Sequence, residues 1–177
     1  LYISKKVFEP TSTTNIILES CLKKIKKPSK ILDLGCGSGI IGLSLFKKGK
    51  TKEPIFFSDV SNEAIKSVYK NAKYHNTLVD ARCGNLFEPW KGYKFDYIIN
   101  DVAGISEDIA KVSDWYKNVS CLSGKDGTKL VNEILKKSNN YLNKNGAIFV
   151  PIISLSNEKK ILSQMKKYFN KITLLGF

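Results

Sequence analysis

The stretch that decides the fold is residues 31–45, which read ILDLGCGSGIIGLSL. Its first four residues, Ile31–Leu34, predict a short buried strand, and the residues from Ile40 onward predict a helix. The glycines between them allow a sharp turn and a close approach of the backbone to a ligand, which a Cβ would block. A strand that runs through such a turn into a helix is typical of α/β sheets that bind ligands at the carboxyl ends of their strands.

The alternation of strand and helix continues on both sides of this stretch. Further strands are predicted at residues 54–58, 78–82, 95–100, 147–153 and 172–177, and helices at 40–49, 61–76, 128–142 and 157–169. The strands are almost continuously apolar, which is typical of parallel strands covered by helices on both faces. The sequence therefore predicts a doubly wound α/β fold with a mostly parallel sheet.

The composition indicates one soluble domain with reduced thiols. The 177 residues suffice for a single core, and no apolar run approaches the ~20 residues that span a membrane. The four cysteines are Cys21, Cys36, Cys83 and Cys121, and the only histidine is His75. This spacing predicts neither a disulfide framework nor a metal site. We expect a cytoplasmic protein without a membrane partner.

The formal charge of +13 invites a nucleic-acid partner. However, Arg82 is the only arginine among the 29 basic residues. Nucleic-acid readers rely on arginine for bidentate contacts and stacking, which lysine does not make. A nucleic-acid partner therefore stays open but is not favoured, and the lysines are interpreted as solvated surface.

Two acids at strand ends point to the ligand. Asp33 directly precedes the glycine turn, and Asp59 follows the second strand, 59 − 35 = 24 residues after Gly35. A carboxylate at the first position suits a cationic ligand group, and one at the second can accept hydrogen bonds from a ribose diol. S-adenosylmethionine carries both features. Residues 37–42, GSGIIG, also match the dinucleotide pattern, which leaves a nicotinamide-dependent oxidoreductase as an alternative.

Residues 31–45 resemble the glycine motif of class I S-adenosylmethionine-dependent methyltransferases, and the chain is most similar to the release-factor glutamine methyltransferases among them. The likeness extends over VFEPTSTTNIILE (7–19), DVSNEAIKSVYKNAKYHN (59–76), CGNLFEPW (83–90) and SGKDGTKLVNEIL (123–135). It implies a Rossmann-like sheet of six to seven strands and a single cofactor-binding domain over residues 1–177. Since the chain opens without methionine and lacks the superfamily's usual seventh strand, we expect it to be truncated at both ends.

The resemblance implies a cofactor site formed by Asp33, Gly35, Gly37, Gly39, Asp59, Val60, Asn85, Leu86 and Asn100. The glycines would line the methionine part of the cofactor, Asp33 would face its amino group, and Asp59 would hold the ribose hydroxyls. Val60 and Leu86 would contact the adenine. Asn85, where the family usually has Asp, would meet the adenine amine. Asn100 would lie beside the methyl group.

The chain departs from the family at residues 100–103, which read NDVA where the family has Asn-Pro-Pro-Tyr. In the family the Asn and the first proline's carbonyl accept hydrogens from the substrate amide, on which the tyrosine stacks. Here Asn100 and Asp101 are predicted to be catalytic. Asp101 would act as a general base or as an anchor for a cationic amine; the alternative is a solvated loop acid. The missing motif favours an acceptor other than the release-factor glutamine.

Four further residues are predicted to contact the substrate. Trp115 and Tyr116 could supply the missing stacking surface, although they could equally pack their loop onto the sheet. Phe8 and Thr14 come from the segment that precedes the first strand in the family. The sequence thus predicts a methyltransferase acting on a nitrogen or oxygen of a small molecule or protein side chain. The alternatives are a catalytically inactive S-adenosylmethionine-binding regulator and an RNA methyltransferase.

Overall fold

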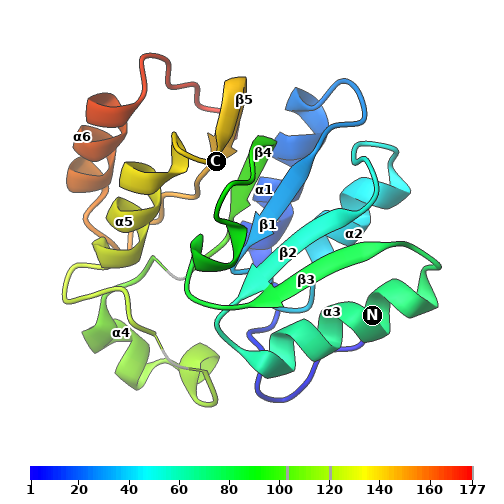
Figure 1. Cartoon of the computed structure of the whole chain (residues 1–177). Coiled ribbons are helices and arrows are strands. Elements are labelled where there is room, and N and C mark those ends of the chain that lie inside the picture. The colour runs from blue at the N-terminus through cyan, green and yellow to red at the C-terminus, as the bar shows by residue number, and fades with distance from the viewer. Residues whose placement is uncertain (103, 120, 177) are drawn as a thin grey trace.

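Five apolar segments pair as parallel strands of one sheet in the order β3-β2-β1-β4-β5 (Figure 1). The computed structural model describes residues 1–102, 104–119 and 121–176. The strands are β1 (Ile31–Leu34), β2 (Ile55–Asp59), β3 (Val79–Cys83), β4 (Phe95–Asn100) and β5 (Leu142–Phe149). Because the strand order reverses between β1 and β4, their carboxyl ends border the crevice where such sheets bind ligands.

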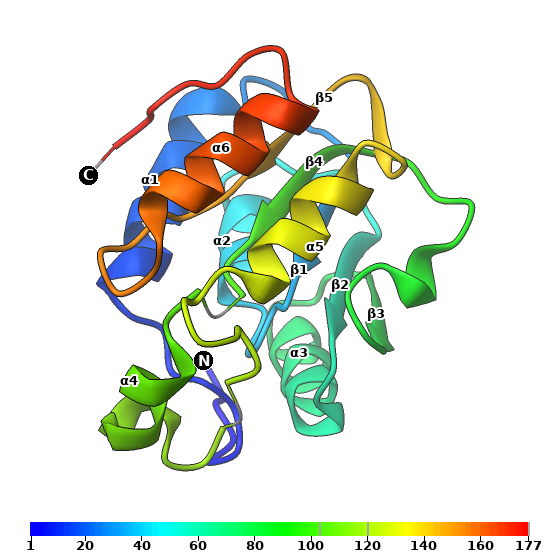
Figure 2. The same cartoon turned by 90° about the vertical axis from the view of Figure 1, so that its left-hand side faces the viewer.

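Helices cover both faces of the sheet (Figures 1 and 2). They are α1 (Ser12–Lys24), α2 (Ile40–Lys47), α3 (Asn62–Tyr74), α4 (Glu107–Val112), α5 (Lys129–Ser138) and α6 (Glu158–Tyr168), with short 3-10 turns η1 (Glu88–Trp90) and η2 (Asp114–Tyr116). Alternate side chains of β1 point to opposite faces of the sheet. Ile31 packs with α1 and α2, whereas Leu32 and Leu34 pack with η1 and α5.

The predicted α/β fold with a parallel sheet is confirmed, and β1 and β4 have the bounds expected from the sequence. The helix predicted from residue 61 also forms: the Ser61 side chain accepts the Ala64 amide and caps α3. The start of α3 matters for the site, because the Ser61 amide donates to the carboxylate of Asp59 at the end of β2.

The prediction of six to seven strands is wrong, since the described residues form five. The expected sixth strand, 172–177, does not form among the described residues. Residues 172–176 run past α1 (Figure 2), and Leu175 packs on the cluster between α1 and the sheet. The last residue of this segment, Phe177, lies outside the described residues. The fifth strand was predicted at 147–153 but spans Leu142–Phe149. Gly146, which was expected to separate the helix at 128–142 from this strand, lies inside β5 at a register irregularity.

Two helices were not predicted. The helix α4 and the η2 turn lie within residues 101–127, for which the sequence predicted no helix or strand, and α1 precedes the first predicted strand. Among the described residues, no helix is long and apolar enough to cross a membrane. The helix α1 and the segment around α4 and η2 both border the carboxyl ends of the strands, so they complete the site.

Candidate active site

The turn after β1 is held to the end of β2. The amides of Gly35 and Cys36 both donate to the Ser58 carbonyl, at 2.8 and 3.0 Å. Gly35 has a φ of +69°, a conformation that side chains disfavour. A Cβ there would also lie 2.3 Å from Cγ2 of Val102. The sequence did not pair Gly35 with Val102, because 67 residues separate them and no local pattern links the two.

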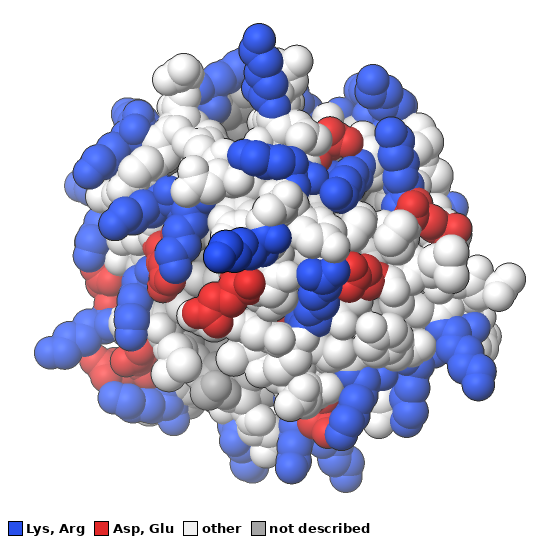
Figure 3. Space-filling model, in the orientation of Figure 1, with Lys and Arg blue, Asp and Glu red and all other residues white. Residues whose placement is uncertain are grey.

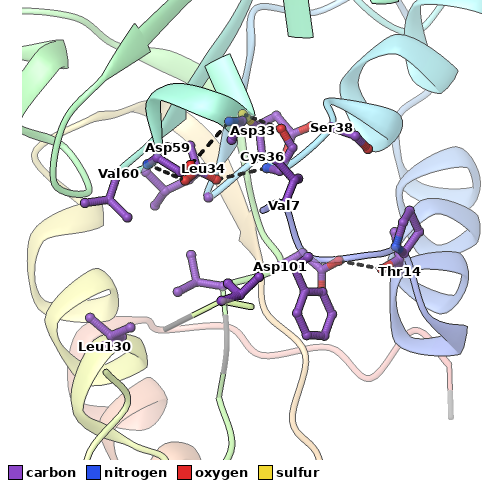
Figure 4. Close-up of a pocket in the computed structure, with 18 of the residues that line it drawn as sticks. Val7, Thr14, Asp33, Leu34, Cys36, Ser38, Asp59, Val60, Asp101 and Leu130 are labelled. Carbon is purple, nitrogen blue, oxygen red and sulfur yellow. Dashed lines mark hydrogen bonds between the residues drawn. The ribbon is translucent and has the colours of Figure 1, made fainter. Parts of the chain in front are cut away.

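Asp59 connects the end of β2 to this turn. Its Oδ2 accepts the Gly37 amide at 3.0 Å, and its Oδ1 accepts the Ser61 amide at 2.9 Å. Burial raises the pKa of Asp59, and these hydrogen bonds oppose the rise. Both carboxylate oxygens are therefore oriented by backbone before any ligand arrives (Figure 4).

Asp33 is almost fully buried in β1, and its Oδ2 accepts the Gly42 amide from α2 at 2.9 Å. Burial raises the pKa of Asp33 to about 8. Gly42, which the sequence analysis treated only as part of GSGIIG, lets α2 approach the sheet: a Cβ there would lie 2.5 Å from the Phe57 ring. Packing thus explains the third glycine of the dinucleotide pattern.

A cavity of about 490 Å³ opens beside these groups (Figure 4). Twelve of the predicted site residues line it, namely Phe8, Thr14, Asp33, Gly35, Gly37, Asp59, Val60, Asn85, Leu86, Asp101, Trp115 and Tyr116. Gly39 instead caps α2, and a Cβ added at this position would contact Val68 and Phe57. Asn100 is fully buried: its Oδ1 accepts the Val102 amide, and its Nδ2 has no partner among the described residues.

Asp101 lies at the mouth of β4 on the cavity wall. Its Oδ2 accepts the hydroxyl of Thr14 at 2.7 Å. Burial raises its pKa to about 6, and the Thr14 hydrogen bond opposes this rise. An acid with such a pKa is ionised at neutral pH yet can hold a proton, which suits a general base.

Aromatic side chains form the wall beside Asp101. The rings of Phe8 and Tyr116 lie 5.1 Å apart, tilted by 43°. Burial raises the pKa of Tyr116, so its hydroxyl stays neutral. Trp115 is 61% exposed and lines the same cavity. Phe8 of the N-terminal segment thus packs on Tyr116 of the η2 turn, although the two residues are 108 positions apart in the sequence.

Comparison with known proteins identifies the family. The sequence model of one protein family, the methyltransferase small domain, matches residues 6–101. These residues contain the glycine turn, Asp33, Asp59 and Asp101. This chain belongs to the methyltransferase small domain family. It is therefore an S-adenosylmethionine-dependent methyltransferase.

Relatives agree in sequence and in fold. A Methanocaldococcus jannaschii protein proposed to be an N5-glutamine methyltransferase is 28% identical over 98% of this chain and 86% of its own length. The release factor glutamine methyltransferase of Aquifex aeolicus is 30% identical over 85% of this chain, which spans only 56% of that relative. The ribosomal protein L11 methylase of Lactobacillus delbrueckii subsp. bulgaricus shares the fold, with a TM-score of 0.66 and a sequence identity of 19%. The superposition covers 92% of this methyltransferase and 70% of the L11 methylase chain.

The cavity fits S-adenosylmethionine, whose ammonium and sulfonium groups are positively charged. Asp33, Asp59 and Asp101 all line it, and Lys6 is the only basic residue among the described residues on its wall. The whole chain has a formal net charge of +13, and lysines are scattered among acids over the face in Figure 3. An acidic cavity in a basic protein favours a cationic cofactor over a dinucleotide pyrophosphate. The nicotinamide alternative is thereby not supported.

Proposed function

We propose that this methyltransferase methylates a nitrogen of a protein side chain and that Asp101 accepts the proton which that nitrogen loses. The observation that carries the proposal is the carboxylate of Asp101 on the cavity wall, half-buried and held by Thr14. Asp101 occupies the position at which the release-factor enzymes have a proline whose carbonyl accepts the substrate's N–H.

The chemistry follows from this carboxylate. When bound, S-adenosylmethionine would supply an electrophilic methyl group for the lone pair of the acceptor nitrogen, and its sulfur would leave as a neutral thioether with the electron pair of the broken bond. The positive charge then lies on the nitrogen, and Asp101 takes the proton that neutralises it. Aligning the nitrogen with the methyl group supplies much of the remaining acceleration.

The other lining residues support cofactor and acceptor. Asp59 accepts hydrogen bonds from the ribose hydroxyls. Asp33 faces the amino group, whose positive charge favours the ionised form of this otherwise protonated carboxyl. Three residues hold the adenine, namely Val60, Asn85 and Leu86. Asn100 does not line the cavity, and its Nδ2, which lacks a partner among the described residues, is the group that we assign to the methyl side of the site. Phe8, Trp115 and Tyr116 form the aromatic wall against which the acceptor side chain packs.

Two acceptors deserve the first test. A glutamine amide is one, because the relatives are named for glutamine methylation. A primary amine is the other, because the carboxylate of Asp101 attracts a cationic amine more strongly than a proline carbonyl does. An RNA acceptor is less favoured, since lysines are scattered among acids over the face in Figure 3 and the cavity is lined by three aspartates.

The test is methyl transfer from isotope-labelled S-adenosylmethionine to protein extract, followed by mass spectrometry of peptides. Model peptides with glutamine or lysine and a set of RNA oligonucleotides serve as defined acceptors. The proposal predicts label on a side-chain nitrogen, at a rate that falls in Asp101→Asn. Label on RNA, on a side-chain oxygen, or at an unchanged rate in Asp101→Asn would overturn it.

A further inference from the structure

Thr14 is held in one orientation by its neighbours. Its side chain, in the first turn of α1, is only 4% exposed. The Thr14 hydroxyl oxygen accepts the Thr11 amide at 3.2 Å and donates to Oδ2 of Asp101 at 2.7 Å. A hydroxyl has one hydrogen, and an amide can only donate. Since the Thr11 amide occupies an acceptor site of the hydroxyl, its single hydrogen is directed at Asp101.

The two carboxylate oxygens of Asp101 consequently differ. Oδ2 is bound by Thr14, whereas Oδ1 accepts no hydrogen bond from a protein group among the described residues. The backbone is fixed on both sides of Asp101, because Asn100 pairs with Leu34 in the sheet and Val102 packs on Gly35. With its backbone and Oδ2 held, Asp101 keeps Oδ1 available to a ligand of the cavity that this residue lines (Asp101 and Thr14 are labelled in Figure 4).

The segment that carries Thr14 is itself anchored. The Tyr2 amide donates to Oδ1 of Asn71 at 2.7 Å, and Nδ2 of Asn71 donates to the Tyr2 carbonyl at 2.9 Å. Further along, Val7 lies beside Gly37, and Phe8 packs on Tyr116. The fold therefore places the Thr14 hydroxyl without help from a ligand.

We propose that Thr14 is a positioning residue for methyl transfer, whose hydroxyl holds Asp101 so that the second carboxylate oxygen meets the acceptor nitrogen. This inference rests on the proposed function of Asp101. It replaces the substrate contact that the sequence suggested for Thr14 with an action through Asp101. The hydrogen bond also links the N-terminal wall of the cavity to the mouth of β4, across 87 residues of sequence.

The first test needs no acceptor. Aspartate carboxyl carbons are labelled with ¹³C, and the pKa of Asp101, assigned from the signal lost in Asp101→Asn, is measured by NMR in the free protein. Thr14→Val should raise this pKa by about one to two pH units, since a donor to the ionised form is lost. Thr14→Ser keeps the hydroxyl and should restore a value near that of the parent.

The matched control is Thr77→Val. The Thr77 hydroxyl donates to Oε1 of Glu53 at 2.8 Å on the surface, so this variant makes the same chemical change away from the cavity. It should leave the pKa of Asp101 unchanged. An unchanged pKa of Asp101 in Thr14→Val, or an equal change in Thr77→Val, would overturn the assignment.

Kinetics then separate positioning from a general structural effect. With the cofactor saturating, Thr14→Val should lower kcat for the acceptor about tenfold or more, shift the acid limb of its pH profile upward, and leave cofactor affinity within about twofold. In the Asp101→Asn background the same substitution should have no further effect; an equal loss there would refute the positioning role. If Asp101→Asn keeps the full rate, the proposed function fails, while the NMR experiment still decides whether Thr14 controls Asp101.

Discussion

The amide of Gly37 donates to the carboxylate of Asp59 at 3.0 Å, which joins the glycine turn after β1 to the acid at the end of β2. The sequence identified both residues, and their contact explains why they occur together. The turn orients one carboxylate oxygen and the start of α3 orients the other through Ser61. The carboxylate of Asp59, which we propose binds the ribose diol, is therefore already ordered by the protein.

Replacing Asp59 by alanine should weaken S-adenosylmethionine binding by about 1–3 kcal/mol, because the ribose hydroxyls lose a charged acceptor. Titration calorimetry with S-adenosylmethionine and S-adenosylhomocysteine measures this, with NAD as the ligand expected not to bind. Asp80→Ala is the control, since Asp80 pairs with Arg82 on β3 away from the cavity. Equal affinities in Asp59→Ala and the parent would remove Asp59 from the cofactor site.

Gly42→Ala should destabilise the protein although alanine favours helices. The added methyl would lie 2.5 and 2.7 Å from two atoms of the Phe57 ring. Such overpacking costs about 1–3 kcal/mol, against a gain in helix propensity of about 1 kcal/mol. Urea unfolding should therefore show a net loss, and the loss should shrink in a Phe57→Leu background. A Gly42→Ala protein as stable as the parent would contradict the close packing of α2 on β2.

Asp33 should make the ligand-free protein less stable as pH rises. Burial raises its pKa to about 8 from an ordinary value of 3.8, so the native protein keeps a proton that the unfolded chain has lost between these pH values. The free energy of unfolding must then fall with pH over this window. Asp33→Asn removes the effect, so its stability relative to the parent should increase from about pH 4 to about pH 8.

Asp126→Asn provides the control for that experiment. Hydrogen bonds from Lys160 and Thr128 lower the pKa of Asp126 to about 2. Its ionised carboxylate therefore contributes fully to the free energy of unfolding at pH values above its ordinary pKa of 3.8, and this contribution is lost only as the pH falls toward 2. The stability difference between Asp126→Asn and the parent should therefore be flat from pH 5 to pH 8. A flat difference for Asp33→Asn as well would mean that Asp33 is not buried in its protonated form.

Tyr116→Ala should raise KM for the acceptor about three- to tenfold, the range expected for loss of an aromatic contact, with little change in cofactor affinity. Tyr116→Phe keeps the ring that packs on Phe8 and should behave as the parent does. The alternative from the sequence, in which this side chain only packs its loop, predicts lower stability with an unchanged KM. Steady-state kinetics combined with thermal unfolding distinguish the two.

The proximity of the glycine turn and Asp59 could be predicted from the sequence because the signals for it are local. The glycine turn follows β1 directly, and Asp59 ends β2, so a parallel sheet brings them to one edge. β1 and β4 had clear apolar runs with polar ends, and their bounds were predicted correctly. Gly146 misled the prediction of β5, since a glycine that marks a helix end and one that marks a strand irregularity have the same local sequence.

The acceptor side could be predicted only as a set of residues, without its contacts. The bond between Thr14 and Asp101 spans 87 residues, and the packing of Phe8 on Tyr116 spans 108. Such pairs depend on how α1 and η2 approach the strand ends. No periodicity or turn signal encodes that approach, because it results from packing of the whole sheet.

The most direct test of the account is the pH dependence of methyl transfer by the parent and by Asp101→Asn, with the cofactor saturating. The parent's rate should rise with pH to a plateau with a midpoint at or below about 6, since burial sets the pKa of Asp101 near that value and the positive cofactor lowers it further. Asp101→Asn should lose this limb and about a hundredfold or more in rate. An Asp101→Asn variant with the parent's rate and pH profile would contradict a proton-accepting role for Asp101.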